Sequence, residues 1–132
     1  MAQDVALAVD PTSARKARRF VRSILNESAP AVVDTAELLV SELVTNAVRH
    51  ADHHECSSTV GLRISVDEHL VRLEVSDGDP AIPEVQHPNS DVPSGRGMLI
   101  VERLAARWGC FRAGEGKVVW LELAREQIPG YV

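Results

Sequence analysis

The segment SELVTNAVRH, residues 41–50, carries a carboxylate, an amide and a cation at helical spacing. Glu42 and Asn46 are four residues apart and share one helix face, which Arg49 and His50 continue by one turn. An amide oxygen can ligate Mg²⁺, a carboxylate can orient or deprotonate a hydroxyl or water, and a guanidinium can neutralise phosphate. The set suits the triphosphate end of a nucleotide. Taken alone, such a face is more often the solvated side of an amphipathic helix.

A second motif, VSDGDP at residues 75–80, ends a segment of alternating apolar residues. Asp77 can accept a hydrogen bond from an exocyclic amine such as that of adenine, and Gly78 lets a ligand approach the backbone closely. Asp-Gly is also ordinary turn chemistry, so this motif alone does not separate a binding site from a strand-ending turn.

A third motif, SGRGM at residues 94–98, places two glycines where a helix is expected to begin. Unpaired N–H groups near Gly95 and Gly97, together with the positive end of the helix dipole, would form an anion site. The strand–GxGxxG–helix context of a dinucleotide-binding fold is missing, and a glycine hinge or helix cap is the alternative interpretation.

Apolar periodicity predicts the elements that must position these groups. Residues 5–9 suggest an edge strand, and residues 10–13 read as a turn with a helix N-cap. Helical spacing predicts helices on both sides of a break at Pro30, and strict alternation predicts two hairpins separated by a polar, proline-rich loop. The expected helices are 14–26, 34–51 and 95–106, the hairpin strands are 59–66, 70–76, 108–111 and 117–123, and the loop is 77–94.

The strands all alternate, so the two faces of their sheet differ and one can meet solvent. This pattern predicts an α+β fold, a two-layer α/β sandwich in which helices cover one face of a mixed, mainly antiparallel sheet. With 132 residues, the chain has the size of one domain, and we expect residues 1–132 to form it.

Composition narrows the class of partner. The net charge of −5 argues against nonspecific binding to nucleic acid or anionic lipid. No apolar run approaches the roughly 20 residues that cross a bilayer, and no run resembles a signal peptide. We therefore expect a cytoplasmic protein without direct contact to nucleic acid or membrane. The basic run Arg15, Lys16, Arg18 and Arg19 reads as a solvated or protein-docking helix face.

Histidine and cysteine gather near residue 50. His50, His53 and His54 share a helix face near Cys56, so metal binding is conceivable, although imidazoles at a helix C-terminus also simply favour the dipole. Cys56 and Cys110 match no zinc-finger spacing, and idle thiols are expected in preference to a bridge.

Taken in order, the motifs resemble those of the GHKL ATPases, which include histidine-kinase catalytic domains and gyrase. The similarity is strongest to the short bacterial serine kinases that act as anti-sigma factors, and to their actinobacterial relatives. It covers the chain from about residue 10 onward and is carried by the stretches SELVTNAVRHA, VSDGDPAIP, GRGMLIVERLAARWG and GKVVWLEL.

This resemblance implies a Bergerat-type fold with an ATP site between sheet and helices, closed by a lid at about residues 79–94. It implies Glu42 as the catalytic base, Asn46 as the Mg²⁺ ligand and Asp77 as the reader of the adenine amino group. The remaining nucleotide-binding positions that it implies are Arg49, His50, Gly78, Gly95, Arg96, Gly97 and Met98.

The resemblance also implies a function: an Mg·ATP-dependent serine/threonine kinase that acts as an anti-sigma factor and phosphorylates an anti-anti-sigma protein. Its other partner would be a sigma factor, and a homodimer is a further expectation. The intact Glu42–Asn46 pair favours the kinase. Asp79 and Ala81 stand where the family has glycines, and the lid is short, which favours a module that binds nucleotide and a protein partner without phosphorylating it.

Overall fold

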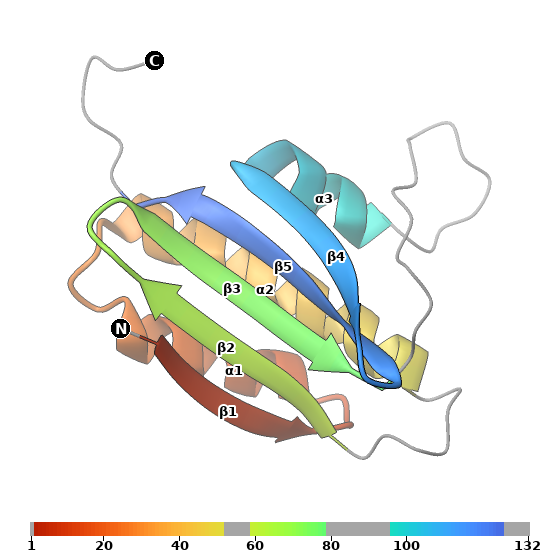
Figure 1. The fold of residues 1–132 in the computed structure, drawn as a ribbon. Coiled ribbons are helices and arrows are strands. Elements are labelled where there is room, and N and C mark those ends of the chain that lie inside the picture. Colours follow the sequence, from red (N-terminus) through yellow and green to blue (C-terminus); the bar gives the residue numbers. More distant parts are fainter. Residues whose placement is uncertain (1, 52–58, 79–95, 126–132) are drawn as a thin grey trace.

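The computed structural model describes residues 2–51, 59–78 and 96–125, without the side chains of residues 50, 51, 96 and 97. The described residues form five strands and three helices, and Figure 1 shows how these elements are arranged. In chain order they are β1 (Ala2–Ala8), α1 (Ser13–Ile24), α2 (Pro30–Ala51), β2 (Thr59–Val66), β3 (Leu70–Asp77), α3 (Arg96–Leu104), β4 (Arg107–Ala113) and β5 (Gly116–Ala124).

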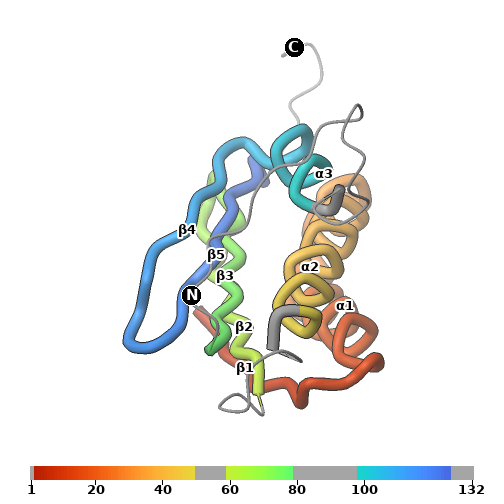
Figure 2. The backbone as a smooth tube through the Cα atoms, turned by 90° about the vertical axis from the view of Figure 1, so that its right-hand side faces the viewer, coloured from red at the N-terminus to blue at the C-terminus, as the bar shows by residue number. Residues whose placement is uncertain are grey.

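The strands form one sheet in the order β1-β2-β3-β5-β4, and each neighbouring pair is antiparallel. Figure 2 shows α1, α2 and α3 on the same side of this sheet. The predicted α+β sandwich is therefore confirmed, with antiparallel pairing throughout the described strands in place of the mixed sheet expected. The predicted edge strand is present, but it runs over residues 2–8 and not 5–9, and β5 lies inside the sheet between β3 and β4.

The core lies between α2 and the inner face of the sheet. Alternation along each strand points every second side chain toward the helices, and the apolar stripe of α2 meets them. The buried core residues of these elements are Leu7, Val60, Leu62, Ile64, Val71, Leu73, Val75, Val119, Leu121 and Leu123 from the sheet, and Val32, Val33, Ala36, Leu39, Val40, Leu43, Val44 and Ala47 from α2.

Helix α2 begins at Pro30, four residues before the predicted start at residue 34. Proline lacks an N–H, but the first turn of a helix leaves its N–H groups without intrahelical partners, so Pro30 fits there. The carbonyl of Ala29 accepts hydrogen bonds from the N–H groups of Val32 and Val33, which closes the first turn. Pro30 therefore marks the start of α2, and the break expected at this residue lies earlier, because α1 already ends at Ile24.

Side-chain contacts fix α1 against α2. Arg18 donates a hydrogen bond to the hydroxyl of Ser41 over 2.9 Å, and Arg22 pairs with Glu37. The expected cap at residues 10–13 differs in detail: Thr12 precedes α1 but makes no capping bond, and the Asp10 carboxylate accepts the Thr12 N–H at 2.7 Å. The Asp10 side chain therefore shapes the turn into α1.

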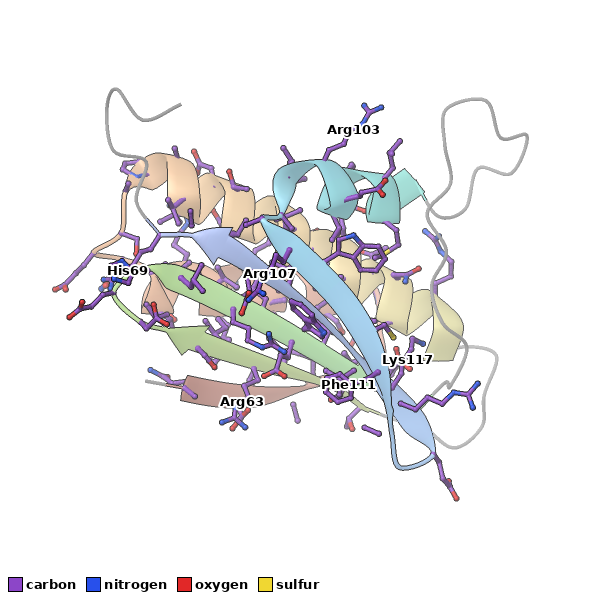
Figure 3. All side chains as sticks on the ribbon, turned by 45° about the horizontal axis from the view of Figure 1, so that its top comes forward. Arg63, His69, Arg103, Arg107, Phe111 and Lys117 are labelled. Carbon is purple, nitrogen blue, oxygen red and sulfur yellow. The ribbon has the colours of Figure 1, made fainter. Side chains whose placement is uncertain are left out.

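The outer face of the sheet carries a polar cluster that links β3, β5 and β4. Glu122 accepts hydrogen bonds from Arg107 Nε at 2.9 Å and Arg72 Nη1 at 3.2 Å, and the Arg72 guanidinium lies 4.3 Å from the Trp120 ring centroid. Arg107 is labelled on this face in Figure 3. Within the described ranges, no helix is long and apolar enough to span a membrane.

Candidate functional site

Asp77 is the last residue of β3, and its side chain is buried on the inner face of the sheet. The period of two along a strand puts it on the same face as Val71, Leu73 and Val75, which are core residues. The Asp77 side chain is only 1% exposed. The carboxylate singled out from the sequence therefore faces the helix layer at one end of the core.

The partner of Asp77 is Lys117, at the start of β5. The two residues are directly opposite in the β3–β5 register, and Lys117 Nζ lies 3.1 Å from Asp77 Oδ1. The Lys117 side chain is 0% exposed. In Figure 3, Lys117 is labelled beside the β4–β5 turn, near the C-terminal end of α2.

Sequence reasoning missed Lys117, although one signal was available. Lys117 shares the alternating set of Val119, Leu121 and Leu123, all of which are core residues, so its side chain had to point inward. Gly116 supports the same junction, because a Cβ at this position would collide with the carbonyl oxygen of Asp77. The start of β5 therefore fits closely against the end of β3.

Helix α2 presents Glu42 and Asn46 on one half-buried face, next to the core residues Leu43 and Ala47. Arg49, one turn farther on, is exposed. Within the described part of the chain, the structure gives Glu42 and Asn46 no side-chain hydrogen bond or ion pair. Figures 1 and 2 agree that the C-terminal half of α2 lies against the end of the sheet at which β3 stops.

Helix α3 begins at Arg96, so Gly97 and Met98 lie in its first turn, where helix geometry leaves N–H groups without intrahelical partners. Met98 is buried at 2% exposure, and its side chain joins the core. Helix α2 packs against α3, β3 and β5, so it contacts the other elements that carry the motifs. Gly78 follows Asp77 and is half-buried.

Several predicted positions lie outside the described residues: the lid at 79–94, Gly95, His53, His54, Cys56, and the side chains of His50 and Arg96. Among the residues that are described, no group of three or more His, Cys, Asp or Glu side chains could hold a metal ion. A hollow of about 240 Å³ is lined by Asp4, Arg63, Glu74, Ser76 and Val118, among other residues. It opens on the outer face of the sheet, opposite Asp77.

Cys110 of β4 is a free, half-buried thiol close to the buried ion pair. It lies opposite Val119, on the inner face, one alternation step from Lys117. Burial raises the pKa of the Cys110 thiol; Lys117 partly offsets this rise, and Asp77 adds to it. The charges of Asp77 and Lys117 therefore both influence the pKa of the Cys110 thiol.

Comparisons with known proteins agree with this geometry. Over 93 residues the chain is 36% identical to blue-light-activated histidine kinase 2 of Erythrobacter litoralis, covering 68% of this chain and 27% of that protein. The structure of the RsbU and RsbW domains of Rv1364c from Mycobacterium tuberculosis superposes with a TM-score of 0.72 at 19% identity, covering 96% of this chain and 33% of that one. The chain thus spans about a quarter to a third of these two relatives.

The catalytic domain of the histidine kinase ThkA has the same fold, with a TM-score of 0.57 at 15% identity over 93% of this chain and 97% of that domain. Residues 7–123 match the family described as histidine kinase-like ATPase domain. That match runs from β1 to the end of β5 and includes the helix bearing Glu42 and Asn46, the buried Asp77 and the start of α3. The chain belongs to the histidine kinase-like ATPase domain family.

Proposed function

We propose that this chain binds Mg·ATP between the inner face of its sheet and helices α2 and α3, and transfers the γ-phosphate to a serine or threonine of a protein partner. The family implies nucleotide binding. The observation that carries the proposal to these residues is the buried carboxylate of Asp77, at the sheet end that the C-terminal half of α2 covers.

Each side chain has a definite part in this proposal. Asp77 accepts a hydrogen bond from the adenine amino group. The first-turn N–H groups of α3 and the guanidinium of Arg49 stabilise phosphate charge. Glu42, half-buried and one turn from Asn46, accepts the proton of the attacking hydroxyl.

The residues present fit a magnesium ion. Asn46 offers an amide oxygen on a half-buried helix face, and the structure gives its side chain no other hydrogen-bond partner within the described residues. Mg²⁺ prefers oxygen ligands and usually completes its shell with water and phosphate oxygens. When bound, the ion would neutralise charge on the transferred phosphoryl group.

The partners proposed are a sigma factor and an anti-anti-sigma protein, with the chain acting as an anti-sigma factor in the cytoplasm. Two observations support this choice. The motifs resemble those of the anti-sigma serine kinases over most of the chain, and the fold is similar to that of a protein containing an RsbW domain. We propose further that residues 1–132 act as one domain and form a homodimer.

A second candidate function is a module that binds nucleotide and regulates a partner without phosphorylating it. Asp79 and Ala81, in place of the glycines of the family's turn, favour this candidate. Incubating the protein with Mg²⁺, γ-labelled ATP and candidate anti-anti-sigma proteins separates the two. Label on a serine or threonine of the partner supports the kinase, ATP binding without transfer supports the module, and absence of ATP binding defeats both.

A further inference from the structure

A second hollow, of about 250 Å³, lies where the beginning of α2, the end of α3 and the end of β5 come together. Figure 1 shows that α3 runs back toward the end of α2 at which that helix begins. Small and apolar side chains make up most of the lining, with Ala31, Val32, Leu104, Ala105 and Leu123 among them. The hollow therefore has the shape and the chemistry to receive an apolar side chain.

The polar groups on its walls already have partners. The Thr35 hydroxyl donates a hydrogen bond to the carbonyl oxygen of Ala31 over 2.9 Å. The N–H groups of Ala105 and Ala106 donate to backbone carbonyl oxygens at 2.9 and 2.8 Å. An occupant would gain little from new hydrogen bonds with these groups and most from removing carbon atoms from water.

Two exposed leucines belong to the same surface. Leu104, which lines the hollow, is 47% exposed, and Leu38 of α2 is 43% exposed. Leu38 follows Thr35 by three residues and is therefore its neighbour on the helix surface. An apolar hollow with exposed leucines beside it is typical of a surface that a partner covers.

One stripe of α2 leads from this hollow to the proposed catalytic base. Thr35, Leu38 and Glu42 follow one another at intervals of three and four residues, so they lie in line on one helix face. At 1.5 Å per residue, the seven residues from Thr35 to Glu42 span about 10 Å along the helix axis. An extended segment rises about 3.3 Å per residue, so three or four residues of a bound partner cover this distance.

We propose that the hollow between α2 and α3 binds an apolar side chain of the protein substrate, three or four residues from the serine or threonine that is phosphorylated. Binding there positions the acceptor hydroxyl at Glu42. The inference rests on the proposed kinase function and deepens it by defining a feature of the substrate. Asp34 and Glu42 stand four residues before and after Leu38, so a lysine or arginine between the apolar residue and the hydroxyl would complement their charge.

The experiment measures phosphotransfer by the full chain to the anti-anti-sigma protein that the labelling assay identifies, at saturating Mg·ATP. Leu104→Ser removes an apolar wall of the hollow, and Ala31→Trp fills it. Each variant should raise KM for the protein substrate by roughly tenfold, with little change in kcat or in ATP affinity. Phe111→Ser is the matched control, because Phe111 is 45% exposed but lies on β4, on the outer face of the sheet. This control should keep the wild-type KM.

The substrate provides an independent test. Mass spectrometry identifies the phosphorylated residue, and an apolar residue should stand three or four positions from it. Replacing that residue by serine should raise KM as Leu104→Ser does, and combining the two changes should raise it little further, because both remove one contact. In the wild type, the methyl signals of Leu104 should shift when the substrate protein is added.

Three results would overturn the inference: unchanged KM in folded Leu104→Ser and Ala31→Trp, no apolar residue at the stated spacing, or methyl signals that do not move. Circular dichroism and ATP titration establish that each variant is folded. If the wild type phosphorylates none of the candidate proteins, the proposed kinase function itself fails. Phosphorylation with a KM that does not depend on the hollow would leave that function standing and remove only the docking site.

Discussion

Asp77 and Lys117 lie directly opposite each other on β3 and β5, and their charged groups meet 3.1 Å apart where neither side chain is exposed. Forty residues separate them along the chain. The pair links the end of β3 to the start of β5. Both lie at the end of the sheet nearest the C-terminal half of α2 (Figure 1). The pair is therefore both a structural element and part of the proposed nucleotide site.

Removing one member of this pair should destabilise the fold strongly. Lys117→Met leaves the Asp77 carboxylate buried without its cation, and breaking such a pair costs about 3–5 kcal/mol. The double variant Lys117→Met/Asp77→Asn leaves no lone charge and should recover much of that loss. Urea denaturation of the wild type, both single variants and the double variant checks this. Additive losses would show that the two side chains do not act as a pair.

Nucleotide binding should depend on Asn46 and Asp77. Asn46→Ala removes the proposed magnesium ligand, and Asp77→Asn replaces one of the two acceptor oxygens with a donating NH₂ group, so both variants should lose measurable affinity for Mg·ATP. Thr45→Ala is the control, because Thr45 is exposed on the same helix. Calorimetric titration provides the measurement. Unchanged affinity in both Asn46→Ala and Asp77→Asn would mean that the site lies elsewhere.

Part of this site could be predicted from the sequence, because local rules determine it. Four-residue spacing placed Glu42 and Asn46 together, and alternation placed Asp77 at a strand end. The contact with Lys117 could not be predicted locally, since it requires β5 to pair with β3 across the sheet. Pro30 shows another limit: the sequence suggested a helix break at this residue, but α1 already ends at Ile24, and Pro30 begins α2.

Phosphotransfer should depend on Glu42 more than binding does. Glu42→Ala removes the proposed base but leaves Asn46 and Asp77 in place, so the rate should fall by a factor on the order of 10²–10⁴ with little change in ATP affinity. Glu42→Gln keeps the shape and should lose a similar factor. Single-turnover transfer of γ-labelled phosphate to the partner protein measures this. If either variant phosphorylates as fast as the wild type, Glu42 does not act as the base.

Stability should decrease in acid partly through Glu122. Hydrogen bonds from Arg107, and then from Arg72, hold the pKa of Glu122 below its ordinary value, against the opposing effect of burial. The folded state therefore favours the ionised form, and its stabilising contribution is present above the ordinary glutamate pKa of about 4.3 and is lost as the pH falls through the lower folded value.

Glu122→Gln should accordingly flatten the dependence of unfolding free energy on pH in this acidic window. Arg107→Met should do the same, because it removes the main cause of the lowered pKa. Arg103→Met serves as control, since Arg103 is exposed on α3 and is labelled away from the sheet in Figure 3. Denaturation curves at several acidic pH values test this. If the unfolding free energy of Glu122→Gln depends on pH as steeply as that of the wild type, Glu122 does not contribute to the acid sensitivity.

The thiol of Cys110 should report on occupancy of the nucleotide site. The raised pKa of Cys110 lowers its thiolate fraction at neutral pH. Cys56→Ser leaves Cys110 as the one cysteine of the sequence. In this variant, alkylation by iodoacetamide should be slow at neutral pH, and its rate should rise at a higher pH than the rate of an unperturbed thiol does. Cys110 faces the same side of the sheet as Lys117, one alternation step away, so bound nucleotide should slow alkylation further. Mass spectrometry measures the modified fraction with Mg·ATP, and with Mg²⁺ alone as control. Equal rates of alkylation with and without saturating ATP would mean that the adenine ring binds away from this edge of the sheet.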